Sequence, residues 1–232
     1  MRMCLGWIAL LGSLSAWSGD YPLVDAQECR PRAGLPNFFA KAGTPGAEIK
    51  IAYFGGSITA APGWRVKSLA HFQKTYPEAK FSEIHAAIGG TGSDLGVFRC
   101  KQDVIDKKPD LVLIEFAVND GGASPEQIHR CMEGIVRQIW TALPSCDIGF
   151  VYTITEQLAT SMYEGKFQRS ASAMEKLADH YGIPTIHMAM EVCKLAKDGK
   201  LLWRAQIPKT PEEKEKVGDK VVFANDSVHP HI

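Results

Sequence analysis

A serine near the start of the chain and a histidine–aspartate pair near its end are the residues whose types and spacing could perform chemistry. Ser57 directly follows an apolar run and the glycine pair Gly55-Gly56. Near the far end, Asp226 precedes His229 by three residues. Within one tight loop, this spacing lets the carboxylate hold one nitrogen of the imidazole while the other nitrogen faces a nucleophile. The three side chains therefore predict nucleophilic catalysis, with Ser57 as nucleophile, His229 as base and Asp226 as the orienting carboxylate.

Each of these residues also has a simpler interpretation. A serine after a strand is more often a helix cap or a turn residue, and a lone loop histidine is often only a surface residue. The Gly-Xaa-Ser-Xaa-Gly elbow of α/β-hydrolases is absent, because Thr59 stands where its second glycine is needed. His231 is the closest competitor of His229, but it has no carboxylate three residues before it. No histidine has a metal-like spacing with carboxylates and no Cys-Xaa-Xaa-Cys occurs, so the sequence predicts no metal site.

The elements that must position these residues alternate between strand and helix from residue 48 onward. Residues 110–118 are almost continuously apolar, as expected of a central parallel strand covered on both faces. Asp94 is a candidate cap for one helix, and Ser124-Pro125 opens another with a start that resembles a capping box. The alternation predicts one α/β domain with three layers around a mostly parallel, five-stranded sheet. The expected strands are 48–54, 81–88, 110–118, 147–155 and 182–187, the expected helices are 65–76, 95–107, 124–143, 167–181 and 189–197, and the charged segment 209–220 is expected to be a solvated helix or loop.

Polar or glycine-rich segments follow three of the expected strands. They are Gly55-Gly56-Ser57, Gly89-Gly90-Thr91 and Asn119-Asp120. Because ligands bind at the carboxyl ends of the strands in parallel α/β sheets, we expect these segments to converge on one rim. The stretch from Gly89 to Gly96 lacks the Gly-Lys-Ser/Thr of a phosphate-binding P-loop, although its backbone N–H groups could still form a nest for an anion.

Two further residues have both a structural and a functional interpretation. Glu115 lies on the same face of its strand as Asn119, and a buried carboxylate needs a partner or a shifted pKa. We expect it to be hydrogen-bonded inside the protein, with support of the floor of the site as the alternative. Trp64 follows the serine loop and could either line a substrate cleft or pack at a helix start.

The chain resembles the SGNH (GDSL-type) hydrolase superfamily in four blocks, which read FGGSIT, IGGTGSDLG, FAVND and DSVHP and span residues 54–230. The usual first block is Gly-Asp-Ser, and here Gly56 replaces the aspartate, a variant found in some secreted, carbohydrate-directed members. The usual third block is Gly-Xaa-Asn-Asp, and here Ala117 replaces the glycine while Asn119 is kept. Four blocks in order make the resemblance specific. It implies the flavodoxin-like SGNH hydrolase fold.

The resemblance also implies ester hydrolysis through an acyl-enzyme, without a metal or an organic cofactor. Ser57 would attack the ester carbonyl, His229 would take the serine proton and Asp226 would fix the imidazole. The oxyanion would be held by the backbone N–H groups of Ser57 and Gly90 and by the side-chain amide of Asn119. The residues expected to line a substrate cleft are Gly56, Trp64 and Asp120.

The substrate is not determined by these motifs. A secreted, cofactor-free esterase of this family fits removal of an acetyl or another small acyl group from polysaccharide. Two alternatives stay open, namely a hydrolase of lysophospholipid or other lipid esters, and a catalytically silent carbohydrate-binding protein on the same fold. A pocket that closes after a few ångströms would favour acetyl esters, whereas a long apolar groove would favour lipid.

The first 26 residues have the composition of a secretory signal peptide. They combine the basic Arg2, an apolar stretch over residues 4–14, and a small-residue cleavage site at Val24-Asp25-Ala26, with an earlier cut near Ala16 as the alternative. The apolar run is too short to span a bilayer comfortably. We therefore expect a secreted or periplasmic protein that leaves the membrane once the signal peptide (1–26) is removed.

The remaining chain, residues 27–232, is expected to form one SGNH hydrolase-like domain. Relatives of this kind usually continue beyond the histidine block with a closing helix, and because the sequence ends at Ile232 we expect the domain to lack that helix. The formal net charge is zero, with 26 basic and 26 acidic residues and no long like-charge block. Composition therefore suggests neither nucleic acid nor an anionic membrane as a partner, and a neutral or weakly charged ligand fits better. The resemblance implies that this ligand is an acylated carbohydrate or another small ester. The oligomeric state stays open.

Cysteine usage leaves disulfide formation open as well. Export permits disulfides, but the number of cysteines after position 26 is odd, so at least one thiol is unpaired within a monomer. These cysteines, whose pairing the sequence does not specify, are Cys29, Cys100, Cys131, Cys146 and Cys193.

Overall fold

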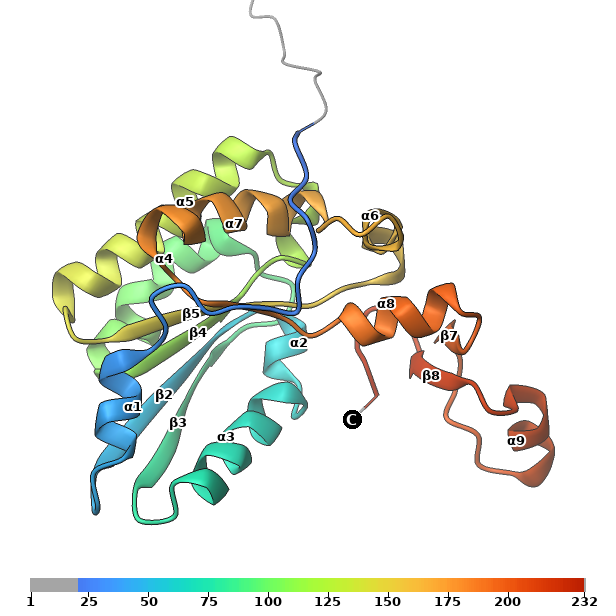
Figure 1. The fold of residues 1–232 in the computed structure, drawn as a ribbon, viewed down its shortest axis with the longest axis horizontal. Helices are drawn as coiled ribbons and strands as arrows, with labels where there is room; N and C mark the ends of the chain where they lie inside the picture. Colours follow the sequence, from blue (N-terminus) through green and yellow to red (C-terminus); the bar gives the residue numbers. More distant parts are fainter. Residues whose placement is uncertain (1–20, 232) are drawn as a thin grey trace, which may run out of the picture.

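A parallel sheet with helices on both faces builds the structure, as the strand–helix alternation predicted (Figure 1). This computed structural model describes residues 21–231. Within that range the main sheet has six strands in the order β1-β6-β5-β4-β2-β3. The strands are β1 (Cys29–Arg30), β2 (Glu48–Gly55), β3 (Lys80–Ala87), β4 (Leu111–Glu115), β5 (Asp147–Tyr152) and β6 (Thr185–His187).

The strands from β3 at one edge to β6 run parallel. The sequence predicted five strands, and the additional strand of the described sheet is β1. It pairs antiparallel with β6, with Cys29 opposite Ile186 and Arg30 opposite Thr185. A segment of two residues is too short to show the alternating pattern that identifies a strand, so only the structure reveals it.

The direction in which strands are added reverses beside β2. This strand lies between β3 and β4, so the chain leaves β2 toward one edge and then returns to its other side. Such a reversal opens a crevice at the carboxyl ends of the strands, and open α/β sheets bind their ligands there. The loop after β2 carries Ser57 and the loop after β4 carries Asn119, so both lie at this crevice.

Helices cover both faces of the sheet. They are α1 (Pro36–Ala42) and α3 (Trp64–Thr75) on one face, and α4 (Ser93–Asp103), α5 (Pro125–Ala142) and α7 (Arg169–Tyr181) on the other (Figure 1). Since successive side chains of a strand point to opposite faces, β2 contributes to both interiors. Ile51 and Tyr53 pack in the cluster beneath α1 and α3, whereas Ala52 and Phe54 pack in the larger cluster beneath α4, α5 and α7.

The predicted start of α5 is confirmed in part. Ser124 precedes the helix, and its hydroxyl accepts a hydrogen bond from the backbone N–H of Gln127 at 3.2 Å. This bond satisfies one of the N–H groups that a helix start leaves without a partner. Shorter elements connect the main ones, and they are α2 (Ser57–Ala60), η1 (Ile105–Lys107), η2 (Asn119–Gly122), η3 (Glu156–Leu158) and α6 (Thr160–Tyr163).

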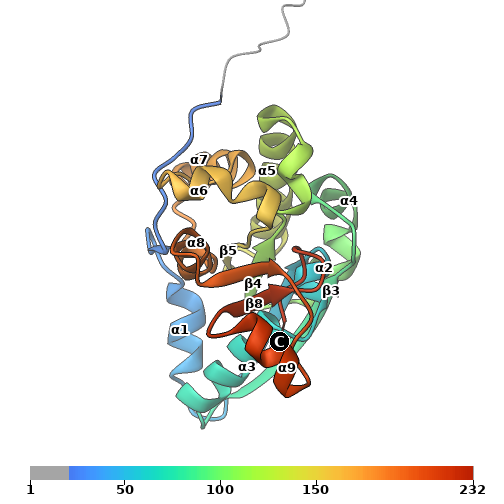
Figure 2. The ribbon, with the colours of Figure 1, turned by 90° about the vertical axis from the view of Figure 1, so that its right-hand side faces the viewer.

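After α8 (Met190–Lys197) the chain forms an extension at the carboxyl end of the sheet, which Figure 2 shows from the front. Its strands β7 (Leu201–Arg204) and β8 (Val221–Ala224) pair parallel with each other, and α9 (Pro211–Val217) lies between them in sequence. The sequence predicted only a charged helix or loop over 209–220. The charged segment forms α9, which begins with a capping box, but the two flanking strands were not predicted because each is only four residues long.

Most of the predicted signal peptide, residues 1–20, lies outside the described residues. Its last part, Tyr21 to Ala26, packs on the domain. The N–H of Val24 donates to Ser172 Oγ at 3.1 Å, and its carbonyl accepts from the N–H of Phe167 at 2.9 Å. Ala26 donates through its N–H to the carbonyl of Gly165 at 2.8 Å. These contacts make residues 21–26 part of the folded unit.

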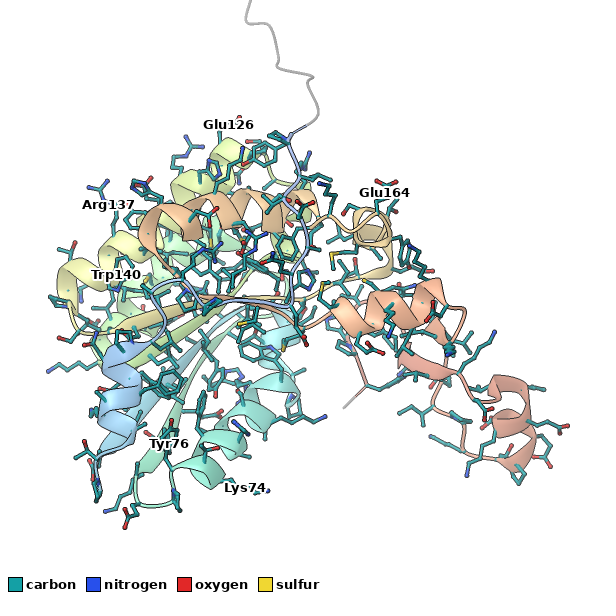
Figure 3. All side chains as sticks on the ribbon, viewed as in Figure 1. Lys74, Tyr76, Glu126, Arg137, Trp140 and Glu164 are labelled. Carbon is teal, nitrogen blue, oxygen red and sulfur yellow. The ribbon has the colours of Figure 1, made fainter. Side chains whose placement is uncertain are left out.

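The surface is charged and the thiols are unpaired. Figure 3 shows Lys74, Arg137 and Glu164 at the periphery, pointing away from the sheet, and all three are exposed. The five cysteines between residues 21 and 231 are free; Cys29 is exposed and the others are buried. No helix in this range is long and apolar enough to cross a membrane.

Candidate active site

Ser57 is the first residue of α2, directly beyond the end of β2. The turn between strand and helix requires glycine, because a Cβ at Gly55 would lie 2.5 Å from Thr59 Oγ1 and 2.6 Å from the carbonyl oxygen of Glu115. No side chain fits in that space. The chain can therefore turn from β2 into α2 while staying in close contact with the end of β4.

The structure brings Ser57 together with both partners predicted for it. Ser57 Oγ lies 2.7 Å from His229 Nε2, although the two residues are 172 positions apart in sequence. On the other side of the ring, His229 Nδ1 lies 2.6 Å from Asp226 Oδ2. Serine, imidazole and carboxylate thus form one continuous chain of hydrogen bonds, the arrangement that activates a serine hydroxyl.

The carboxylate of Asp226 determines which imidazole nitrogen carries the proton. Its Oδ1 accepts hydrogen bonds from the backbone N–H groups of Val228 at 2.9 Å and His229 at 2.8 Å. The hydrogen bond with the His229 ring, together with these two, holds the pKa of Asp226 below its usual range. Asp226 is therefore ionised and only accepts, so Nδ1 of the neutral His229 ring donates to it and Nε2 is left to accept from Ser57.

The extension after α8 holds the histidine loop in place. Pro230 forms an isolated bridge with Ala224 of β8, and the N–H of His231 donates to the carbonyl of Phe223 at 2.8 Å. Ser227, inside the loop, has a φ of 64°, which is uncommon for a residue other than glycine and lets the chain fold back around Asp226. The β7–β8 pair thus holds the loop of His229 in place, whereas the sequence predicted only that His229 lies in a tight loop with Asp226.

The loops after β3 and β4 also reach Ser57, as predicted. A Cβ at Gly89 would lie 3.7 Å from Ser57 Cβ, and the next residue, Gly90, has a φ of 75° that favours glycine. The side chain of Asn119 lies against Gly56, where any Cβ would overlap its amide group. Asn119 Oδ1 is buried without a hydrogen-bond partner. The absence of the usual aspartate at position 56 thus has a physical reason, because its side chain would displace Asn119.

Asp120 lies elsewhere than the sequence predicted. It is 3% exposed, and its Oδ1 accepts a hydrogen bond from the N–H of Ser93 at 2.9 Å. It therefore caps α4 instead of lining a cleft, while the predicted cap, Asp94, lies inside the first turn of that helix. The correction has a tertiary cause, because a carboxylate from a distant loop occupies the position beside Gly92, which leaves no room for a side chain there.

A cavity of about 230 Å³ is lined by the residues that follow Ser57 and His229 in sequence, Ile58 and Pro230, while Ser57 and His229 themselves are not among its lining residues. Trp64 lines it and also packs edge-on against Tyr53 at the start of α3, with ring centroids 5.3 Å apart, so the predicted packing at a helix start is confirmed while its role toward a substrate stays a prediction. Most of the other lining residues come from the second half of the chain, where no motif marked them. These are Thr153, Ile154, Met188, Ala189, Val192, Phe223 and His231; Ala61 and two residues of the sequence blocks, Ile58 and Pro230, also line the cavity. A larger groove, of about 830 Å³, lies between α4 and α5 and contains none of the predicted site residues.

Glu115 is completely buried at the end of β4 and is hydrogen-bonded, as predicted. Thr59 Oγ1 donates to its Oε2 at 2.9 Å, and Thr153 Oγ1 donates to its Oε1 at 2.8 Å. Burial raises the pKa of Glu115 to about 7, against the effect of both hydrogen bonds. The threonine partners were not predicted, because the expected strand 147–155 included Thr153, whereas β5 ends at Tyr152 and leaves Thr153 at the strand end.

The fold is that of an α/β protein, and at its rim Ser57, His229 and Asp226 form one chain of hydrogen bonds. A model of the GDSL-like lipase/acylhydrolase family matches residues 53–230, and the chain belongs to this family. The match covers all four sequence blocks described above. No match was found among curated protein sequences.

Several solved structures of esterases are similar. A two-domain esterase active on acetylated mannans, co-crystallised with mannopentaose, superposes with a TM-score of 0.60 at 26% identity, over 83% of this chain and 46% of that one. The chain thus spans about half the length of that relative. A catalytic mutant of Axe2, an acetylxylan esterase from Geobacillus stearothermophilus, gives a TM-score of 0.58 at 16% identity, over 75% of this chain and 93% of that one. AlinE4, an SGNH-hydrolase family esterase, gives 0.51 at 20% identity over 75% and 93%. The last two show the fold alone.

The raised pKa of Glu115 predicts how its substitution changes stability with pH. Between about pH 4.5 and pH 7 the folded protein retains a proton that the unfolded chain has released, so this group lowers the free energy of unfolding as the pH rises. Glutamine has no such proton. We expect E115Q to gain about 2–3 kcal/mol relative to the wild type between pH 5 and pH 8, measured by denaturant unfolding at each pH.

A matched control is Glu164→Gln, which changes an exposed side chain. Its unfolding free energy should follow that of the wild type at every pH. If the E115Q curve also runs parallel to the wild-type curve, Glu115 does not have the raised pKa described here.

Proposed function

We propose that this protein is a secreted serine esterase that removes acetyl or another short acyl group from polysaccharide. Ser57 is the nucleophile, His229 the general base and Asp226 the carboxylate that orients it. The observation that carries the proposal is the chain of hydrogen bonds from Ser57 Oγ to His229 Nε2 at 2.7 Å and from His229 Nδ1 to Asp226 Oδ2 at 2.6 Å. Family membership supports the same chemistry.

The reaction proceeds in two halves. Ser57 Oγ attacks the ester carbonyl as His229 Nε2 takes its proton, and the imidazolium that forms is stabilised by the ionised Asp226. His229 then gives the proton to the departing sugar oxygen, which leaves an acyl group on Ser57. Water, activated by the same nitrogen, releases the acid and restores the serine. Every proton transfer uses the single nitrogen that faces Ser57.

The oxyanion is stabilised by groups that surround Ser57. We assign this role to the N–H groups of Ser57 and Gly90 and to the side-chain amide of Asn119, with Gly56 leaving the space that the amide needs. In that amide only the Nδ2 group donates hydrogen bonds, so Nδ2 is the atom of Asn119 that would contact the oxyanion. Loss of one oxyanion donor typically costs about 3 kcal/mol of transition-state stabilisation.

The size of the cavity lined by Ile58 and Pro230, the residues that follow Ser57 and His229, supports a short acyl group. At about 230 Å³ it is smaller than the ~300–1,000 Å³ of pockets for drug-sized ligands and somewhat larger than a ~150 Å³ cavity that holds benzene. Together with the relative that is active on acetylated mannans, this size favours acetyl esters of carbohydrates. A lipid ester would need a longer apolar groove.

Active-site labelling tests the nucleophile. The purified protein should form one covalent adduct with a fluorophosphonate probe, seen by intact mass, and Ser57→Ala should form none while its thermal unfolding stays nearly unchanged. Ser145→Ala, which alters an exposed serine before β5, is the matched control and should label like the wild type. Labelling of Ser57→Ala would exclude Ser57 as the nucleophile. No adduct on the wild type would favour the alternative, a silent carbohydrate-binding protein.

A panel of p-nitrophenyl esters tests the acyl group. We expect kcat/KM to be highest for acetate and to fall at least about tenfold by octanoate, because one tenfold step is only about 1.4 kcal/mol of lost transition-state binding. Met188→Ala enlarges the cavity and should shift the preference toward longer chains. Activity that rises with chain length in the wild type would instead support the lipid-ester alternative.

The mature start of the secreted protein is a further expectation. Because residues 21–26 pack on the domain, we place the cleavage of the signal peptide at the earlier alternative, near Ala16. Intact-mass analysis of protein exported from cells that express the full sequence should find a chain that retains Tyr21. A mature chain that begins after Ala26, or no export, would contradict this expectation.

A further inference from the structure

We infer that Glu115 is a positioning residue, which sets the orientation of Ser57. It bridges Thr59 on α2, the helix that begins with Ser57 (the serine helix), to Thr153 at the end of β5. The inference rests on the proposed function of Ser57. It assigns to the buried carboxylate a role in the reaction without contact with the substrate.

The serine helix cannot hold its own position. It has only four residues, and its start lacks a side-chain cap. Isolated helices of less than about 12 residues are marginal in water, so a single turn depends on tertiary contacts. At its end, Arg65 and His85 hydrogen-bond to the carbonyl of Ala60. Two further hydrogen bonds hold its middle, from Thr59 Oγ1 to Glu115 and from Arg65 Nε to the Thr59 carbonyl at 3.1 Å. Both act on the residue two positions after Ser57.

The bridge continues from Glu115 to the wall of the cavity. Thr153, which donates to the other carboxylate oxygen, lines the cavity and accepts through its carbonyl from Gln168 Nε2 at 3.0 Å. Gln168 Oε1 in turn lies 3.1 Å from His187 Nε2. His187 Nδ1 accepts from the N–H of Ala189 at 3.2 Å, so Nε2 carries the ring proton and donates to Gln168. Ala189 also lines the cavity.

Stability alone does not account for a carboxyl group at this position. A charge or polar group without water is costly to bury, and replacing buried polar groups with apolar ones of similar volume is often neutral or stabilising. Glu115 has no exposed surface, and no cation lies among its hydrogen-bond partners in the described chain. What it supplies is a pair of oxygens that span two threonines on different elements, which an apolar side chain could not do.

Three substitutions separate a positioning role from a structural one. Thr59→Val and Glu115→Met each break the bridge with little change in volume, whereas Glu115→Gln preserves it, because an amide can hydrogen-bond both threonine hydroxyls. Thr185→Val is the matched control: Thr185 is a buried threonine that accepts a hydrogen bond from Arg32 at 3.0 Å, in β6 and outside the network. The measurements are kcat and KM on p-nitrophenyl acetate, the rate of fluorophosphonate labelling, and thermal unfolding.

We expect Thr59→Val and Glu115→Met to lower kcat and the labelling rate at least about tenfold, with KM nearly unchanged, because a small misplacement of a reacting group can cost up to about 10²-fold. Glu115→Gln should stay within about threefold of the wild type by the same argument. Thr185→Val should lower the unfolding temperature but leave kcat unchanged. If Glu115→Met does not fold, Thr59→Val decides the test.

Wild-type kcat and labelling in Thr59→Val would overturn the positioning role. So would a loss of kcat in Glu115→Gln as large as in Glu115→Met. These results are distinct from failure of the proposed function, in which the wild-type protein itself would be neither labelled nor active. In that case the role of Glu115 would fall with it.

Discussion

The close approach of the end of β2 to the end of β4 is the constraint on which the site depends. At Gly55 and Gly56 the backbone turns against the carbonyl of Glu115 and the amide of Asn119, with no room for a side chain. This contact arises where the strand order reverses, because β2 and β4 are neighbours in the sheet although β3 lies between them in sequence. It places the proposed nucleophile, Ser57, beside the proposed oxyanion donor, Asn119. The strand order of the sheet therefore brings together the two residues on which the proposed chemistry depends.

The elements that carry the site are short and are held by side chains from other elements. The serine helix has one turn, and the start of α4 is capped by Asp120 from the loop after β4. Beneath them, Glu115 accepts hydrogen bonds from elements on both sides of it. Polar groups in such a setting lower the stability that an apolar interior would provide, and they fix geometry in return. The polar groups at the rim thus lower stability but fix the positions of the site's side chains, while the apolar strands beneath them supply the free energy of folding.

His229 lies in the segment after α8, outside the main sheet that carries Ser57. Asp226 and His229 form a self-contained turn, in which one carboxylate oxygen binds two backbone N–H groups and the other binds the imidazole. The β7–β8 pair and the bridge from Ala224 to Pro230 hold that turn against Ser57, together with a hydrogen bond from the N–H of Glu156 to the carbonyl of Ser227. The local turn therefore orients the imidazole of His229, and the extension after α8 holds that turn beside Ser57. This division explains why the pair is recognisable in sequence while its docking is not.

The sequence by itself determined the layered α/β fold and the types of residue at the rim. Apolar runs such as that of β4 identify buried strands, and the spacing of Asp226 and His229 is short enough for local geometry to decide their contact. Only the tertiary structure decided the edge strand β1, the β7–β8 pair, the capping role of Asp120 and the cavity wall. Each of these depends on contacts between residues far apart in the chain, and such contacts leave no periodic pattern in the segments that make them. The hydrogen-bond partners of Glu115 were likewise decided only by the tertiary structure. From the sequence, a buried carboxylate predicts that hydrogen-bond donors lie beside it, but not which residues provide them.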